Sequence, residues 1–283
     1  MNYRHAFHAG GFADVLKHAT LVRILVHLLA KPTPFRVIDT HAGAGRYDLR
    51  NDEASRGGEW RDGIARLLSA PLPDSGRLLL APYLDAVARW NEIASLTVYP
   101  GSPLLVRAFV RQQDRLIACE LEPNAAAALA RNLARDRRCK AIAIDGWTAL
   151  NAFIPPKERR GLVLIDPPFE EASEFTRLGK AVDAALRKWT SGTYLIWYPL
   201  KERAPAEKLA KSLRSFTDVK ILRAEINVGG PVNADRLRAC GLVVINPPWT
   251  LESELRTILP TLAHALSRGR GSAHRVDWLV GEK

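Results

Sequence analysis

Apolar residues recur three or four positions apart over residues 13–30, near the beginning of the chain. This spacing places them on one face of a helix, because an α-helix has 3.6 residues per turn. Pro32 and Pro34 follow at once, and proline both fixes φ and lacks a backbone N–H donor. The pattern therefore predicts a helix that ends before these prolines.

Short apolar runs follow this helix, and most of them are separated by helical patterns. The first run, residues 35–39, is β-prone and ends at Asp39. Further buried strands are predicted at 116–120, 141–145, 162–166, 193–198, 221–228 and 242–245, with helices at 123–135 and 175–188. The alternation predicts an α/β fold with a mostly parallel, doubly wound sheet, right-handed crossovers and a terminal antiparallel hairpin.

One stretch interrupts the alternation, directly after the first strand and its small-residue turn at 40–45. Residues 48–97 look helical and polar, with breaks at Gly57-Gly58 and at Pro71-Leu-Pro73. We expect a helical insertion subdomain within a single domain of residues 1–283. Because the insertion follows the turn, it would lie beside a ligand site there and contribute to substrate choice.

The charge balance favours an anionic partner. The chain has 41 Lys and Arg against 30 Asp and Glu, which gives a formal net charge of +11. A phosphate backbone is the commonest partner of such a protein, because each neutralised phosphate releases counterions. A membrane surface and plain solubility remain alternative explanations of the charge.

Nothing in the sequence predicts export, a membrane span or a disulfide framework. The first 18 residues have no apolar core before a small-residue cleavage site, and the apolar stretch at 21–30 is too short to cross a bilayer. Cys119, Cys139 and Cys240 are isolated and lack C-x-x-C spacing, which argues against disulfides and zinc. We expect a cytoplasmic protein with no membrane partner.

The strand ends carry the candidate chemistry, since ligands bind beyond the carboxyl ends of strands in an open parallel sheet. The turn after Asp39 contains Gly43 and Gly45, but Asp48 stands where a dinucleotide fingerprint needs its third glycine, which disfavours an NAD-binding dehydrogenase. Glu120 ends the next strand and could accept from ribose hydroxyls. Asp145 and its neighbour could read an adenine edge. Taken alone, each acid is more often a solvated loop residue or a helix cap.

The sharpest motif is Asp166-Pro-Pro-Phe169, which follows a strand of four apolar residues. An adenine N6 amine is a poor nucleophile because its lone pair is delocalised into the ring. Asp166 and the Pro167 carbonyl could accept its two hydrogens and direct the lone pair towards a methyl donor, while Phe169 stacks on a flipped base. A buried strand ending in a proline turn without chemistry is the alternative.

A second motif of the same form, Asn246-Pro-Pro-Trp249, is predicted not to be catalytic. It follows the other acids by a long interval and belongs to the expected terminal hairpin, whereas Asp166 follows Asp145 by one βα unit. We interpret it as a structural bend or an RNA-facing platform on which Trp249 could stack.

Together these segments resemble one family. Five segments are similar to motifs of the bacterial 23S ribosomal RNA adenine-N6 methyltransferase J family, RlmJ: Tyr3-Arg-His-x-x-His-Ala-Gly10, Ala13-Asp-Val-Leu-Lys-His18, Thr40-His-Ala-Gly-Ala-Gly-Arg-Tyr47, Tyr99-Pro-Gly-Ser-Pro103 and Asp166-Pro-Pro-Phe169. The late segments Trp197-Tyr-Pro199 and Asn246-Pro-Pro-Trp249 extend the resemblance over nearly the whole chain.

The resemblance implies a Rossmann-like class I fold that uses S-adenosylmethionine and releases S-adenosylhomocysteine. It implies Asp166 as the catalytic residue, and cofactor contacts at His18, His41, Ser102, Glu120, Asp145, Gly146 and Asp166. It further implies substrate contacts at Tyr3, Lys17, Pro167 and Phe169. The implied substrate is the adenine at position 2030 of 23S rRNA, reached before ribosome assembly is complete, and we expect a monomer.

One residue departs from the family pattern, and several alternatives remain open. The family often has Tyr after the two prolines, so Phe169 here retains stacking without a phenolic hydroxyl. A DNA adenine methyltransferase and a non-catalytic RNA-binding protein on the same fold are the rival functions. The histidines His5, His8, His18 and His41 have no cluster of carboxylates or thiolates at ligand spacing, so no metal is expected.

The arginine-rich pieces complete the candidate residues. They lie at 135–138, 159–160 and 268–270, and such runs are usually solvated. Some of them could grip phosphates, provided that they share a face with Asp166.

Overall fold

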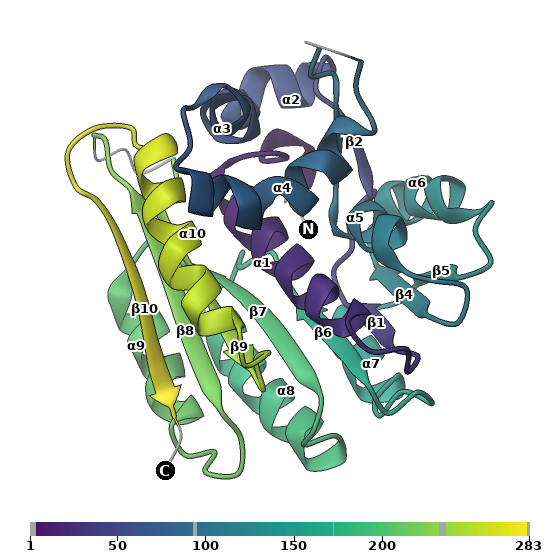
Figure 1. Cartoon of the computed structure of the whole chain (residues 1–283). Coiled ribbons are helices and arrows are strands. Elements are labelled where there is room, and N and C mark those ends of the chain that lie inside the picture. Colours follow the sequence, from purple (N-terminus) through teal and green to yellow (C-terminus); the bar gives the residue numbers. More distant parts are fainter. Residues whose placement is uncertain (1–3, 93–94, 172, 232–235, 282–283) are drawn as a thin grey trace.

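An eight-stranded sheet forms the centre of the protein, which is described here by a computed structural model (Figure 1). The structure describes residues 4–92, 95–171, 173–231 and 236–281. The strand order is β10-β8-β9-β7-β6-β1-β4-β5. The strands are β1 (Arg36–Asp39), β4 (Arg115–Glu120), β5 (Cys139–Ala143), β6 (Gly161–Ile165), β7 (Thr193–Pro199), β8 (Ile221–Val228), β9 (Ala239–Ile245) and β10 (Ser272–Val280).

Strand directions divide the sheet into two parts. β1 pairs in parallel with β4 and β6, and the parallel pairing continues from β4 to β5 and from β6 to β7. β9 is antiparallel to both β7 and β8, and β10 is antiparallel to β8. The predicted α/β fold, with a mostly parallel sheet and an antiparallel terminal part, is confirmed. The edge strand β10 was not among the predicted strands, because its half-exposed residues His274, Arg275 and Asp277 break the apolar run.

Most strand predictions agree with the structure, but several boundaries were wrong, and β9 begins three residues before the predicted 242–245. The prediction of residues 221–228 coincides with β8. The strand predicted to end at Asp145 ends at Ala143, because the Asp145 side chain accepts from the backbone N–H of Thr148 and caps the next helix. The strand predicted to end at Asp166 ends one residue earlier, where two prolines follow. Both acids therefore lie in loops at the carboxyl edge of the sheet.

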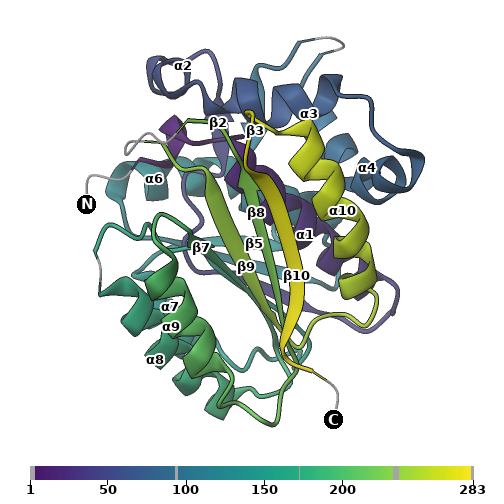
Figure 2. The same cartoon turned by 90° about the vertical axis from the view of Figure 1, so that its left-hand side faces the viewer.

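Helices cover both faces of the sheet, as Figure 2 shows. α7 (Gly146–Ala152), α8 (Glu174–Lys188) and α9 (Arg203–Leu213) pack on one face. The other face carries α1 (Phe12–Leu29), α5 (Ser102–Phe109), α6 (Pro123–Leu133) and α10 (Leu251–Ala265). In the described residues no helix is long and apolar enough to cross a membrane.

α1 is enclosed on nearly all sides, although its sequence is only partly apolar. It contacts α4 (Asp74–Ala88), α5, α10 and the π-helical turn η2 (Arg61–Ala65) as well as the sheet. Asp14, Lys17 and His18 are consequently buried together with the apolar residues of this helix. Charged groups buried this way need partners, because an unpaired charge in a protein interior is costly.

Helices also occupy much of the stretch after the first strand. α2 (Asp52–Gly57), η2, α3 (Arg66–Ser69) and α4 follow one another between two short strands, β2 (Arg46–Asp48) and β3 (Val98–Pro100), which pair antiparallel. The insertion contacts the N-terminal segment, which contains the 3-10 helix η1 (His5–Phe7). A Cβ on Gly63 would come within 2.1 Å of the Gly10 carbonyl oxygen, so this contact requires glycine.

Candidate active site

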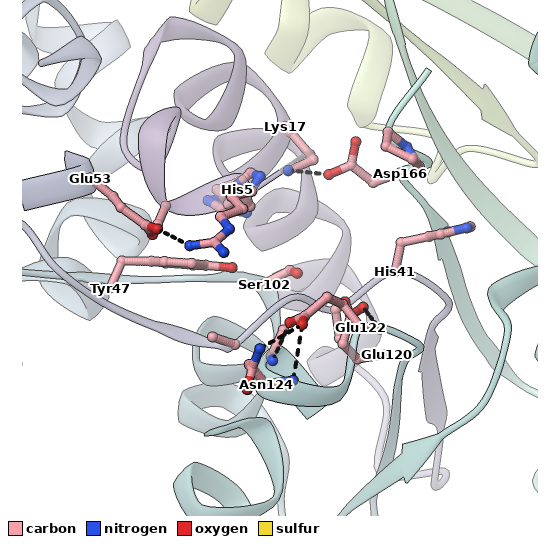
Figure 3. Close-up of a pocket in the computed structure, with 17 residues that line it drawn as sticks. His5, Lys17, His41, Tyr47, Glu53, Ser102, Glu120, Glu122, Asn124 and Asp166 are labelled. Atoms are coloured by element: carbon pink, nitrogen blue, oxygen red, sulfur yellow. Dashed lines mark hydrogen bonds and ion pairs between the residues drawn. The ribbon is translucent and has the colours of Figure 1, made fainter. Parts of the chain in front are cut away.

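A cavity of about 370 Å³ opens at the carboxyl ends of β1, β4 and β6 (Figure 3). The N-terminal segment and α1 contribute to its walls. Six of the predicted site residues line it: Lys17, His18, His41, Ser102, Glu120 and Asp166. These residues come from five separate segments of the chain, which the sheet and α1 bring together.

Asp166 is held in a buried chain of charges. Lys17 donates from Nζ to Oδ2 of Asp166 and lies 2.8 Å from Oδ1 of Asp14. Burial alone would lower the pKa of Lys17, but the carboxylates of Asp14 and Asp166 outweigh it and raise that pKa well above its usual value. Lys17 is therefore charged. Oδ1 of Asp166 is the oxygen that Lys17 does not use, and it is available to accept from a ligand in the cavity.

Asp14 completes this chain on the side away from the cavity. Its Oδ2 accepts from the backbone N–H of Gly10 at 2.9 Å and lies 3.0 Å from Nε2 of His5. Burial acts to raise the pKa of Asp14, but His5 and Lys17 hold it well below its usual value. Asp14 is ionised and fixes the position of Lys17.

Glu120 is fixed by the backbone around it. Its Oε2 accepts from the N–H of Gly43 at 2.8 Å, and its Oε1 accepts from the N–H groups of Leu121 and Glu122, each at 2.8 Å. Gly43 has φ of 60°, and a Cβ there would come within 2.2 Å of the Tyr47 hydroxyl. The turn thus needs glycine to bring its amide to the carboxylate.

Two buried groups lie at the end of β1 and on α1. Ser102 donates to Oδ2 of Asp39 at 2.6 Å, and burial raises the pKa of Asp39 to about 7. His18 has its Nδ1 2.6 Å from the Tyr99 hydroxyl, and burial lowers its pKa to about 3. With Tyr99 donating to Nδ1, the neutral ring presents Nε2–H, which has no hydrogen-bond partner among the described residues. A ligand carboxylate in the cavity would satisfy this donor.

His41 lies between the cavity and α7. Its Nδ1 is 2.8 Å from the Thr40 hydroxyl, and its ring makes an edge contact with Trp147 at 5.3 Å between centroids. Burial lowers the pKa of His41 to about 4. Gly146 lies directly behind the ring, since a Cβ there would come within 2.6 Å of Nε2. His41 is therefore neutral and oriented by its neighbours.

Comparison with known proteins identifies the family. The family described as "Ribosomal RNA large subunit methyltransferase D, RlmJ" matches residues 32–280. The chain belongs to the RlmJ family. Proteins named ribosomal RNA large subunit methyltransferase J from Haemophilus influenzae and Escherichia coli are each 38% identical to it, over 100% of both chains. The resemblance predicted from the motifs is confirmed.

A solved structure gives the same fold. A crystal structure of a Legionella pneumophila protein is 34% identical, covers 98% of this chain and 99% of its own, and has a TM-score of 0.87. The RlmJ family match itself begins after α1, so Lys17 and His18 are covered by these full-length relatives rather than by the family match.

Several residues that the sequence predicted for the site do not line the cavity. Asp145 caps α7 through the N–H of Thr148 and lies 3.8 Å from Arg177. Pro168 faces the cavity in place of Pro167. Phe169 has φ of 50° and packs its ring against Phe175 and Trp197 rather than into the cavity. Tyr3 lies outside the described residues.

Other lining residues were not predicted. They are Arg4, His5, Ala6, Ala42, Ala44, Tyr47, Glu53, Glu122, Asn124, Ala125 and Pro168. Tyr47 and Ala44 belong to the glycine-containing segment that pointed to the site, so their sequence position was a usable signal. His5 belongs to the Tyr3-Arg-His motif of the resemblance, but no periodicity places it at the cavity, and the packing of the N-terminal segment over α1 brings it there.

Asn246-Pro-Pro-Trp249 lies at the opposite edge of the sheet from Asp166, because β9 runs antiparallel to β7. The Asn246 amide donates to the carbonyl oxygens of Thr190 and Gly192, at 2.7 and 2.8 Å. The two side-chain amide hydrogens of Asn246 thus hold the chain in a bend. The bend is one of the two interpretations that the sequence left open. Trp249 is 86% exposed, which leaves its ring in solvent.

The histidines have partners other than a metal. His5 lies beside Asp14, and His8 has its Nδ1 2.8 Å from Oε1 of Glu59. Among the residues that the structure describes, no three His, Cys, Asp or Glu side chains form a group suited to a metal ion.

Proposed function

We propose that this protein transfers the methyl group of S-adenosylmethionine to the exocyclic N6 of an adenine in 23S rRNA. Membership of the RlmJ family over the whole chain supports a ribosomal RNA methyltransferase. The observation that carries the choice of nitrogen is the position of Asp166 and its prolines, at the end of β6 and at the wall of the cavity.

The residues present fit the cofactor. Glu120 is fixed at the end of β4, where its carboxylate can accept from both ribose hydroxyls. The free Nε2–H of His18 can donate to the carboxylate of the methionine part, beside Ser102 and His41. Asp145 and Gly146 would lie near the adenine ring, behind His41. When bound, the cofactor supplies an electrophilic methyl group on a sulfonium.

Asp166 positions the nucleophile. Its free carboxylate oxygen and the Pro167 carbonyl accept the two N6 hydrogens, so the nitrogen lone pair faces the methyl group. The bound cofactor would supply the methyl group for the new N6–C bond, and S-adenosylhomocysteine would leave with the electron pair on its sulfur. The amine loses one proton towards Asp166. Because the ion pair with Lys17 fixes this carboxylate, Asp166 acts as an orienting acceptor.

The remaining roles complete the proposal. Residues 1–283 act as one methyltransferase domain, with 48–97 as the helical insertion beside the RNA site. Lys17 contacts the substrate while it pairs with Asp166, and Tyr3 is the aromatic residue proposed to stack on the base. Phe169 supports the turn after Asp166 by packing against Phe175 and Trp197. The protein acts in the cytoplasm as a monomer, on 23S rRNA that is free of protein or early in assembly.

The test is a comparison of nucleic acids. Purified protein is incubated with methyl-labelled S-adenosylmethionine and deproteinised 23S RNA, 16S RNA or duplex DNA, and the digested nucleosides are analysed by mass spectrometry. We expect N6-methyladenosine from 23S RNA alone. Label in duplex DNA would replace the proposal with a DNA adenine methyltransferase, and cofactor binding without any methylated product would favour a non-catalytic RNA-binding protein.

A further inference from the structure

A second cavity, of about 350 Å³, lies between the insertion, the β8–β9 hairpin and the segment after α10. We call it the arginine pocket. Its lining residues are Asp62, Arg66, Gly229, Pro231, Arg236, Arg238 and Arg268. Among the described lining residues four guanidinium groups thus surround one carboxylate, so this described part of the lining has a surplus of positive charge.

The pairing inside the arginine pocket leaves that surplus in place. Nη2 of Arg236 pairs with Oδ2 of Asp62 at 2.6 Å. Nε of Arg268 is 3.8 Å from the same oxygen, which is beyond hydrogen-bond range. Arg66 donates to the carbonyl oxygen of Ser267 at 2.7 Å, and Arg238 to that of Gly230 at 3.1 Å. Carbonyl oxygens satisfy donors but do not neutralise charge.

Arg268 is the decisive residue, and it is not the solvated arginine that its sequence context predicted. Its side chain is 9% exposed, and its buried Nε and Nη2 have no hydrogen-bond partner among the described residues. Nη1 donates to the Leu237 carbonyl oxygen at 3.1 Å, and the guanidinium lies 5.3 Å from the centroid of the Phe12 ring. Burial, together with Arg236, lowers the pKa of Arg268. An anion in the pocket would accept hydrogen bonds from Nε and Nη2 of Arg268 and would reduce the repulsion between Arg268 and Arg236.

The pocket lies at the same edge of the sheet as the active site. β9 is antiparallel to both β7 and β8, so β8 ends at the edge where β6 ends. Figure 2 places the end of β8 and the beginning of β9 at the end of the sheet that also carries α3 and β2. Phe12, under Arg268, begins α1, and Lys17 follows about 7.5 Å further along the helix axis, at 1.5 Å per residue.

We propose that the arginine pocket binds a backbone phosphate of the RNA substrate, a few nucleotides from the adenine held at Asp166. This inference rests on the proposed function for the identity of the polymer. Planar guanidinium groups that converge on one space match the several acceptor oxygens of a phosphodiester. A free phosphate ion would meet the same donors, but the shared edge and the net charge of +11 favour a polyanion that spans both sites.

The test compares arginine variants in direct RNA binding. Arg236→Gln and Arg238→Gln are combined, since Arg236 is 41% exposed against 9% for Arg268, and Arg238 donates to the Gly230 carbonyl oxygen rather than to a carboxylate. The matched control is Arg187→Gln on α8, which removes an arginine that is 78% exposed and paired with Asp183. Dissociation constants for deproteinised 23S RNA are measured by filter binding between about 50 and 200 mM salt, and cofactor affinity by calorimetry.

We expect the double variant to bind 23S RNA about tenfold more weakly, with a salt slope reduced by about one unit, while the control and the cofactor affinity stay unchanged. RNA affinity and salt slope equal to those of the control would overturn the proposal. So would wild-type binding of inorganic phosphate, seen in ³¹P spectra and lost in the variant, if the RNA affinity did not change.

Failure of the proposed function gives a different result. If the wild type produces no N6-methyladenosine but the double variant still weakens RNA binding, the phosphate pocket stands and the assigned reaction fails. If methylation is intact and the variant binds RNA like the control, the pocket fails and the reaction stands.

Discussion

Lys17 and Asp166 form an ion pair across 149 residues of sequence, and this pair joins α1 to the loop that follows β6. The side chains are buried or nearly so, with exposed fractions of 5% and 14%. Because Lys17 also pairs with Asp14, the cation sits between two carboxylates. The orientation of the proposed catalytic carboxylate therefore depends on a helix that is distant from it in sequence.

Replacing Asp166 should separate chemistry from cofactor binding. In Asp166→Asn one N6 hydrogen bond loses its charged acceptor, and we expect turnover on 23S RNA to fall by at least about 100-fold. The dissociation constant for S-adenosylmethionine should stay within about twofold, because other residues hold most of the cofactor. Asp183→Asn on α8 is the control, and turnover close to wild type in Asp166→Asn would refute the assignment.

Replacing Glu120 should have the opposite effect. Glu120→Gln removes the charge from an acceptor fixed by three backbone N–H groups. We expect the dissociation constant for S-adenosylmethionine, measured by calorimetry, to rise by about tenfold or more. Glu252→Gln on α10, which loses only a surface pair with Arg256, should bind the cofactor normally. An unchanged constant in Glu120→Gln would remove this residue from the site.

Asp14 should matter for stability as well as for activity. Asp14→Asn removes the charged acceptor of Lys17 and His5 but leaves Lys17 paired with Asp166, so we expect a cost of about 1–3 kcal/mol. Urea unfolding should show a loss of that order, whereas exposed Asp85→Asn on α4 should change stability by less than about 0.5 kcal/mol. Equal stability of the two variants would show that Asp14 does not balance Lys17.

His18 should make the folded protein sensitive to acid. Burial lowers its pKa from 6.5 to about 3, so below about pH 6.5 the unfolded chain takes up a proton that the folded protein does not. Its contribution to stability is therefore lost as the pH falls, by at most about 1.4 kcal/mol per pH unit. Burial of His41 acts in the same direction, while the raised pKa of Asp39 favours the folded state as the pH falls from about 7.

The variant His18→Asn removes the contribution of His18 to the pH dependence of the free energy of unfolding. We expect its free energy of unfolding to fall less steeply than that of the wild type between about pH 6.5 and pH 4.5, in protein free of cofactor. His274→Asn, at an exposed position of β10, should keep the wild-type slope. If His18→Asn and the wild type lost stability in parallel, the folded protein would have to take up the proton at His18.

The sequence by itself determined the elements and the acids that end them. Apolar runs and helical spacing are local properties, and they predicted β8 to the residue and α1 to within one residue at each end. Glu120 and Asp166 could be placed at one cavity because parallel strands bring their carboxyl ends to a common edge. The motif resemblance added Lys17, His18 and Ser102, which no periodicity indicates.

Only the tertiary structure decided which side chains meet and which edge each loop occupies. Asp166-Pro-Pro-Phe169 and Asn246-Pro-Pro-Trp249 are alike as local sequence, but β9 reverses direction and carries the second to the far edge. Asp14 and Lys17 look like surface charges of a helix and are buried because α4, α5 and α10 enclose α1. Arg268 is likewise buried by segments distant in sequence. Contacts of this kind depend on how elements pack, which the spacing of residues along one element does not specify.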